Sequence, residues 1–165
     1  MFEPVPRPAT IEDLKKIIKA FNERGVDYLL IGGYALQAHG YVRTTTDIDI
    51  LVPSGGKTGA DVIRALLVLP DKCAKDIDLA WFDEKGTIRV ADEVVVDIMF
   101  NACGHTYGDL KKYEETIVFD GIPIKTVNLE GLLLTKKTLR DKDVPDRKIL
   151  EKALRAMKSG KKADS

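Results

Sequence analysis

The sequence predicts an α/β or α+β fold with a mixed β-sheet and helices packed on it. Along the 165 residues, segments with helical spacing of apolar residues alternate with short apolar or alternating segments typical of strands. Asp120-Gly121 between two strand-like segments indicates a hairpin, so at least one strand pair is antiparallel. The length suits a single domain over residues 1–165, with a core from about residue 10 to 158 and loose termini.

The first half of the chain predicts helices and strands in alternation. Thr10 is a suitable N-cap and Asp13 places an acidic group in the first turn, so a helix is expected to begin there and to end at Gly25. The other elements expected in this half are a strand over 28–31, a short helix over 34–39, a strand over 47–52 and a helix over 58–69.

The second half predicts more strands, whereas residues 71–85 show no clear pattern. Two strands, 87–90 and 93–99, are expected on either side of a short turn at Ala91-Asp92. The remaining expected elements are a helix over 107–113, hairpin strands over 116–119 and 122–127, and C-terminal helices over 129–139 and 145–158 packed on the sheet.

Composition and charge exclude several classes of protein. Lys+Arg and Asp+Glu both number 26, so the chain lacks the basic excess typical of a general nucleic-acid binder, although a local basic groove stays open. No apolar run approaches the roughly 18 residues of a membrane span, so no membrane association is expected. The first ten residues do not read as a signal peptide, and two cysteines are too few for a disulfide scaffold. A cytoplasmic location is therefore expected.

Residues 29–52 contain the pattern that points to chemistry. A predicted strand ends at Gly32-Gly33 and runs into a helix, and a second strand then contains Asp47-Ile48-Asp49. Because strand side chains alternate, the two aspartates share one face and lie about 7 Å apart along the strand. Two such carboxylates can bracket a hard cation such as Mg²⁺. The plainer alternative is a strand with a solvated polar face.

The two glycines add a second feature to this pattern. Gly32 and Gly33 allow close approach of the backbone, and the helix that follows offers free N–H groups and the positive end of its dipole. Together these features predict a phosphate-binding turn, although the glycines could also serve only a tight turn. Metal-binding carboxylates beside a phosphate site indicate phosphoryl or nucleotidyl transfer.

Ile31-Gly32-Gly33 followed by Asp47-Ile48-Asp49-Ile50 resembles the signature of the polymerase-β-like nucleotidyltransferase superfamily. The resemblance extends from residue 28 to 150, because the stretch 128–150 is similar to small bacterial members grouped with aminoglycoside nucleotidyltransferases and AbiEii-type toxins. It implies the nucleotidyltransferase fold and a third carboxylate on a later strand, for which Asp97 is the match. Many members have serine at the position of Gly33, where a hydroxyl would add a donor to the triphosphate.

The resemblance implies transfer of a nucleoside monophosphate from an NTP such as ATP to an acceptor, with release of pyrophosphate. Asp47, Asp49 and Asp97 would be catalytic and would hold two Mg²⁺ ions, with Mn²⁺ as a substitute. The expected nucleotide-binding residues are Gly32, Gly33, Arg43 and either Lys136 or Lys137. The acceptor is open and could be a small molecule, a protein hydroxyl or an RNA end.

Two rival readings and one internal control accompany this prediction. The protein could be a non-catalytic nucleotide-binding member or a partner in a toxin–antitoxin pair, or a plain interaction domain. A second Asp-x-Asp, Asp76-Ile77-Asp78, lacks an upstream Gly-Gly turn and is expected to have no metal role. Crowding of three unpaired carboxylates also leads us to expect that Asp97→Asn does not destabilise the metal-free protein.

Overall fold

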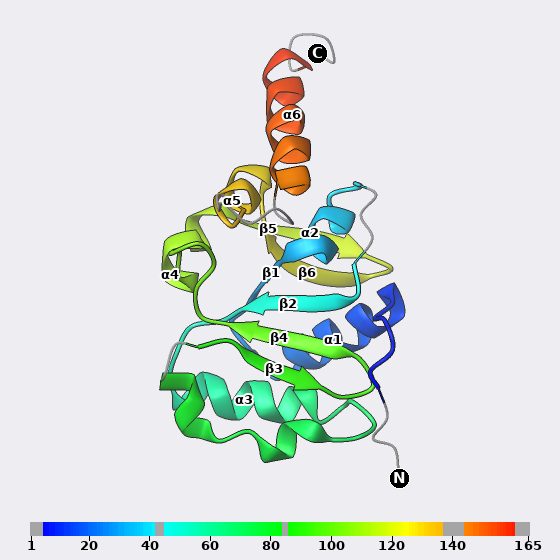
Figure 1. The fold of residues 1–165 in the computed structure, drawn as a ribbon, viewed down its shortest axis with the longest axis vertical. Coiled ribbons are helices and arrows are strands. Elements are labelled where there is room, and N and C mark those ends of the chain that lie inside the picture. The colour runs from blue at the N-terminus through cyan, green and yellow to red at the C-terminus, as the bar shows by residue number, and fades with distance from the viewer. Residues whose placement is uncertain (1–4, 42–44, 84–85, 137–143, 161–165) are drawn as a thin grey trace.

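The computed structural model of the chain describes residues 5–41, 45–83, 86–136 and 144–160. Its strands form one six-stranded sheet in the order β3-β4-β2-β1-β6-β5 (Figure 1). The strands are β1 Leu29–Ile31, β2 Asp47–Leu51, β3 Ile88–Ala91, β4 Val95–Met99, β5 Glu114–Phe119 and β6 Ile122–Val127. The α-helices are α1 Ile11–Glu23, α2 Gly32–Ala38, α3 Gly56–Leu66, α4 Tyr107–Leu110, α5 Leu129–Leu134 and α6 Val144–Gly160.

The sheet is mixed, which confirms the predicted fold class. Strand β2 is antiparallel to β1 and parallel to β4, and β1 is parallel to β6. Two antiparallel pairs, β3 with β4 and β5 with β6, form the two ends of the sheet. The turn between β5 and β6 is the predicted Asp120-Gly121, in which both residues have positive φ.

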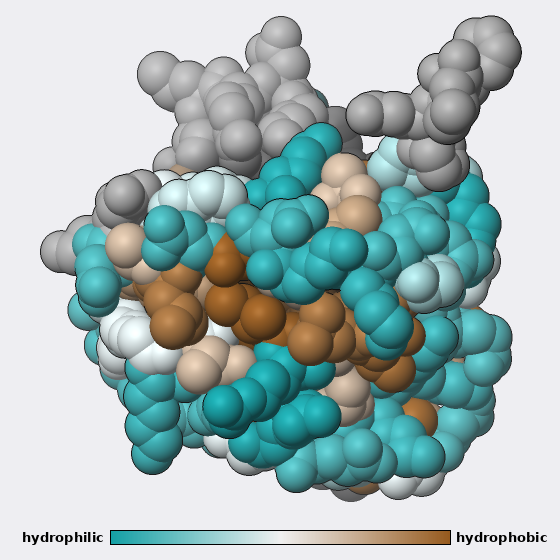
Figure 2. Space-filling view, turned by 90° about the horizontal axis from the view of Figure 1, so that it is seen from below, coloured by the Kyte–Doolittle hydropathy of each residue, from teal (hydrophilic) through white to brown (hydrophobic). Residues whose placement is uncertain are grey.

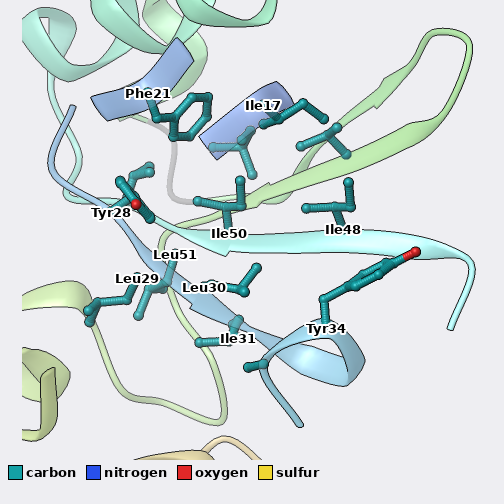
Figure 3. Packing of buried hydrophobic residues seen from close by; sticks show 14 of the residues in the cluster. Ile17, Phe21, Tyr28, Leu29, Leu30, Ile31, Tyr34, Ile48, Ile50 and Leu51 are labelled. Carbon is teal, nitrogen blue, oxygen red and sulfur yellow. The ribbon is translucent and has the colours of Figure 1, made fainter. Parts of the chain in front are cut away.

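One face of the sheet is covered by α1, whose start is set by its sequence. The Thr10 side chain accepts from the backbone N–H of Asp13, and the Asp13 carboxylate accepts from the backbone N–H of Thr10, a complete capping box. The apolar stripe of this helix is fully buried and reaches Ile48 and Ile50 of β2 (Figure 3). Since side chains alternate along a strand, β2 presents its aspartates to the opposite face.

Several predicted elements differ from the structure in their bounds. Helix α3 begins at Gly56 and ends at Leu66, and the unassigned stretch 71–85 contains two 3-10 helices, η1 Cys73–Asp76 and η2 Leu79–Asp83. The predicted helix 107–113 is α4 followed by the 3-10 helix η3 Lys111–Tyr113. Helix α5 ends at Leu134, and the last part of the predicted helix 129–139 lies outside the described residues.

The turn between β3 and β4 is longer than predicted. Strand β3 continues to Ala91, which pairs with Val95, so the connection consists of Asp92, Glu93 and Val94. The Asp92 backbone N–H closes this connection by donating to the Val94 carbonyl at 3.1 Å. This difference changes which side chains of β3 face those of β4, with consequences for the site described below.

The C-terminal helices pack in series. Gly131 of α5 lies against Val127, at the end of β6, and against Tyr113. Helix α6 packs on α5, burying Leu150 and Ala153, and extends away from the sheet (Figure 1).

Some hydrophobic residues reach the surface of the molecule. Figure 2, a view from below Figure 1, shows a hydrophobic band flanked by hydrophilic residues. Between α3 and β3 the chain exposes three large hydrophobic side chains, Val68, Leu79 and Trp81. Within the described ranges, every helix is too short or too polar to cross a membrane.

Candidate active site

The three predicted carboxylates lie on one face of the sheet. Strands β2 and β4 are parallel neighbours, and their register places Asp49 directly beside Asp97. Asp47 lies two residues before Asp49 and therefore shares its face. The side chain of Asp97 is 10% exposed and that of Asp47 is 33% exposed, so Asp97 is nearly buried and Asp47 is more accessible to solvent.

Gly32 is packed against Asp49. Ile31, the last residue of β1, pairs with Asp49, and Gly32 follows at once with a φ of +76°. A Cβ atom built on Gly32 would lie 2.4 Å from Oδ2 of Asp49, closer than any real contact. Glycine is required here both by the backbone conformation and by the carboxylate. The Gly-Gly turn and the Asp-x-Asp motif are thus in direct contact.

Gly33 is packed against Thr45. A Cβ atom on Gly33 would lie 2.7 Å from Cβ of Thr45 and 2.9 Å from its Oγ1. The threonine side chain therefore fills the space that a serine at position 33 would take. In this chain a hydroxyl stands beside the turn even though residue 33 is glycine, and Thr45 also donates to the Asp47 carbonyl at 3.2 Å.

Arg89 is a charged residue at this site that the sequence analysis missed. It lies opposite Asp97 in the β3–β4 register. Its Nε donates to Oδ1 of Asp97 at 3.0 Å, and its Nη2 donates to Oδ2 of Asp97 at 3.1 Å and to Oδ2 of Asp47 at 3.4 Å. The hydrogen bonds from its guanidinium to Asp97, with the charges of the carboxylates, raise the pKa of Arg89 above its ordinary value.

The presence of Arg89 changes the expected electrostatics. Asp97 is not an unpaired charge in a crowd of carboxylates, because a bidentate guanidinium neutralises it. This pairing contradicts the premise of unpaired carboxylates on which the expected stability of Asp97→Asn without metal was based. The pair could have been predicted if the expected strands had put Arg89 and Asp97 on the same face of the sheet. The predicted two-residue turn at Ala91-Asp92 instead puts Arg89 on the opposite face.

The carboxylates suit a hard cation, although their present arrangement is not a metal site. Asp47 and Asp97 converge on one cationic nitrogen of Arg89, and all the available ligands are oxygens, as Mg²⁺ prefers. As the side chains stand, no group of three Asp, Glu, His or Cys residues in the described ranges is placed to hold one metal ion. A metal ion held by all three carboxylates therefore requires these side chains to rearrange.

The remaining predicted nucleotide contacts are Arg43 and either Lys136 or Lys137. Arg43 lies outside the described residues, as do Lys137 and residues 138–143 of the stretch 128–150. Lys136 follows α5, which contacts both α2 and α6. Its predicted role in phosphate binding stays a prediction.

The second Asp-x-Asp and Asp92 do not lie on the strands that carry the three carboxylates. Asp76 ends η1, and Asp78 accepts from the backbone N–H of Ala80 at 2.9 Å, so this second Asp-x-Asp is not in the sheet. Asp92 is buried, and its carboxylate accepts backbone N–H groups of Asp71, Cys73 and Glu93. Burial raises the pKa of Asp92, but these hydrogen bonds outweigh it, so that pKa is lowered.

Comparison with known proteins identifies the fold. No protein-family model and no curated protein matches the sequence significantly. A "putative nucleotidyltransferase" from Thermotoga maritima has a similar structure, with a TM-score of 0.56 and 20% identity over 88% of this chain and 92% of that one. The antibiotic-resistance factor ANT(2'')-Ia matches with a TM-score of 0.45 and 14% identity over 92% of this chain and 94% of that one. The first of these similarities shows that the chain has the fold of a nucleotidyltransferase.

Proposed function

We propose that the protein is a metal-dependent nucleotidyltransferase that moves a nucleoside monophosphate from an NTP to an acceptor hydroxyl and releases pyrophosphate. The main support is the direct contact between the Gly-Gly turn and the aspartate cluster, in which Gly32 packs on Asp49 and Asp49 pairs with Asp97. The fold shared with the Thermotoga maritima protein agrees with this proposal.

In this proposal Asp47, Asp49 and Asp97 hold Mg²⁺, or Mn²⁺ in its place, through their carboxylate oxygens. When bound, such an ion would neutralise charge on the triphosphate and on the departing pyrophosphate. Asp97 accepts the proton of the acceptor hydroxyl as the new oxygen–phosphorus bond forms and the bond between the α and β phosphates breaks. The proton then passes to solvent, so the carboxylate is restored.

The glycine turn holds the phosphates in this proposal. Because Gly32 and Gly33 carry no side chains, the backbone of the turn lies close to Asp49 and Thr45, and the proposal places the phosphates at the N–H groups of this turn. Helix α2 has only seven residues, so hydrogen bonds from its first N–H groups matter more here than its dipole. Arg43 and Lys136 are proposed as further cationic contacts to the phosphates.

The test is transfer of label from α-³²P-labelled NTPs, with Mg²⁺ or Mn²⁺, to a metabolite extract, a protein extract or total RNA. We expect one acceptor pool to gain label with the wild type and none with Asp49→Asn. The matched control changes the other acidic pair, Asp76→Asn with Asp78→Asn, and should keep activity within about threefold. Equal labelling by Asp49→Asn and the wild type would show that the site is wrongly assigned.

A second candidate is a nucleotide-binding protein without turnover, including the predicted partner of a toxin–antitoxin pair. The pairing of Arg89 with Asp97 favours it, because the third carboxylate is neutralised as the side chains stand. Calorimetry with Mg²⁺ and each NTP separates the two candidates. Nucleotide binding that depends on Asp49, without labelling of any acceptor, would support the second.

A further inference from the structure

The guanidinium of Arg89 occupies the position between two of the proposed metal ligands. Both oxygens of Asp97 and one oxygen of Asp47 accept from it. A carboxylate as buried as Asp97 is destabilising unless it has a cationic or hydrogen-bonding partner. Arg89 is that partner in the protein without metal.

Arg89 and a divalent metal ion would compete for these carboxylates in this arrangement. A metal on Asp97 needs at least one of the oxygens that Arg89 now engages, and the two cations would repel each other at such a distance. Arg89 is free to leave, because its side chain is 61% exposed and β3 lies at the edge of the sheet. Its departure would uncover Asp97 without opening the core.

Arg89 borders an open pocket that its side chain could enter on leaving the carboxylates. The pocket has a volume of about 220 Å³ and is lined by Trp81, Gly86, Thr87, Ile88 and Arg89 itself. Trp81 is 41% exposed, so part of its indole ring is accessible. A guanidinium placed over an indole face gains a cation–π interaction, which would offset part of the loss of its carboxylate partners.

We propose that Arg89 is a built-in substitute for the metal: it holds Asp47 and Asp97 together in the metal-free protein and moves to the Trp81 pocket when a divalent metal binds. This inference rests on the proposed function, because it takes the carboxylates to be metal ligands. It goes beyond that function by assigning to this chain a residue that sets the affinity for metal.

The direct test is the affinity of the metal-free protein for Mn²⁺, measured from the electron paramagnetic resonance signal of free Mn²⁺. Arg89→Met removes the competing charge and keeps much of the side-chain length, so Mn²⁺ should bind about three- to tenfold more tightly than to the wild type. Arg89→Lys keeps the charge but loses the bidentate geometry and should give an intermediate affinity. Arg64→Met, on the exposed side of α3, makes the same change of net charge and should bind Mn²⁺ as the wild type does.

Trp81 provides an independent reading of where Arg89 goes. It is the only tryptophan of the chain, so its fluorescence reports on this pocket alone. Saturation with Mg²⁺ should change the Trp81 emission of the wild type and of Arg64→Met, and should leave that of Arg89→Met unchanged. An unchanged emission in the wild type at saturation would overturn the movement to the Trp81 pocket.

The outcomes separate this inference from the proposed function. Unchanged or weaker Mn²⁺ binding by folded Arg89→Met, with measurable binding by the wild type, would overturn the role of Arg89 and leave the metal site standing. Absence of Mn²⁺ binding in every variant would overturn both proposals. Tighter Mn²⁺ binding by Arg89→Met than by the wild type and by Arg64→Met would support both the proposed function and the role of Arg89. Melting of each metal-free variant, followed by circular dichroism, verifies that it folds.

Discussion

Gly32→Ala tests the contact between the glycine turn and Asp49. The change affects the backbone and the site at once, because Gly32 has a φ of +76° and its missing Cβ would lie 2.4 Å from Oδ2 of Asp49. A residue other than glycine in the left-handed region costs about 1–2 kcal/mol. Displacing the Asp49 side chain, whose Cβ would also lie only 3.1 Å away, adds about 1–3 kcal/mol as in other overpacked sites.

The free energy of unfolding of Gly32→Ala should therefore fall by about 2–5 kcal/mol, measured by urea denaturation. Gly25→Ala is the matched control, since Gly25 has a φ of +64° and an added Cβ there meets no atom within 4 Å. This control should lose only the backbone part, about 1–2 kcal/mol. The difference between the two variants measures the clash with Asp49.

A double-mutant cycle identifies the partner in that clash. Combining Gly32→Ala with Asp49→Ala should recover about 1–3 kcal/mol relative to the sum of the single changes, because the carboxylate, which makes the closest of the clashes, is gone and only Cβ of residue 49 remains. Gly32→Ala should also lose metal-dependent nucleotide binding, while Gly25→Ala should keep it. Equal losses of stability in Gly32→Ala and Gly25→Ala, with no coupling to Asp49, would refute the reasoning.

Two further predictions concern other parts of the charge network. Asp97→Asn should lower the stability of the metal-free protein by about 1–2 kcal/mol in urea denaturation, because it breaks the bidentate pair with Arg89; a rise in stability would contradict the pairing. Hydrogen bonds from Arg7 lower the pKa of Asp13 to about 2, against the opposing effect of burial, so its stabilisation is present above about pH 4 and is lost as the pH falls toward 2. Asp13→Asn should therefore lower the free energy of unfolding by about 1–2 kcal/mol at pH 7, after allowing for solvent screening at the exposed Arg7. It should also flatten the pH dependence of the urea midpoint between pH 4 and 2. An unaltered pH dependence would count against this assignment.

Local sequence patterns determined the part of the site that lies on β1, α2 and β2. The period of two along a strand is enough to place Asp47 and Asp49 on the face opposite Ile48 and Ile50. The Gly-Gly pair predicted the turn at the end of β1. The structure adds a reason why residue 32 is glycine, since the Asp49 carboxylate leaves no room for a Cβ atom there. These features could be predicted because they depend on neighbours within a few residues.

The pairing of Arg89 with Asp97 could not be predicted from local patterns, because it depends on the register of a hairpin. A two-residue turn at Ala91-Asp92 would put Arg89 on the face away from Asp97, whereas the observed three-residue connection pairs the two directly. That connection is held by Asp92, whose carboxylate accepts backbone N–H groups of Asp71 and Cys73, about twenty residues earlier in the chain.

The stretch that supplies these N–H groups has no helical or strand period in its sequence, and it folds as short 3-10 helices against the body of the protein. The same stretch carries Trp81 next to Arg89. The sequence alone therefore determined that Asp47 and Asp49 share a face, through the alternation of a strand. The tertiary structure decided that Asp47 and Asp97 face Arg89. Contacts between distant segments set the length of the connection between β3 and β4, and that length determines the face of the sheet on which each side chain of β3 lies.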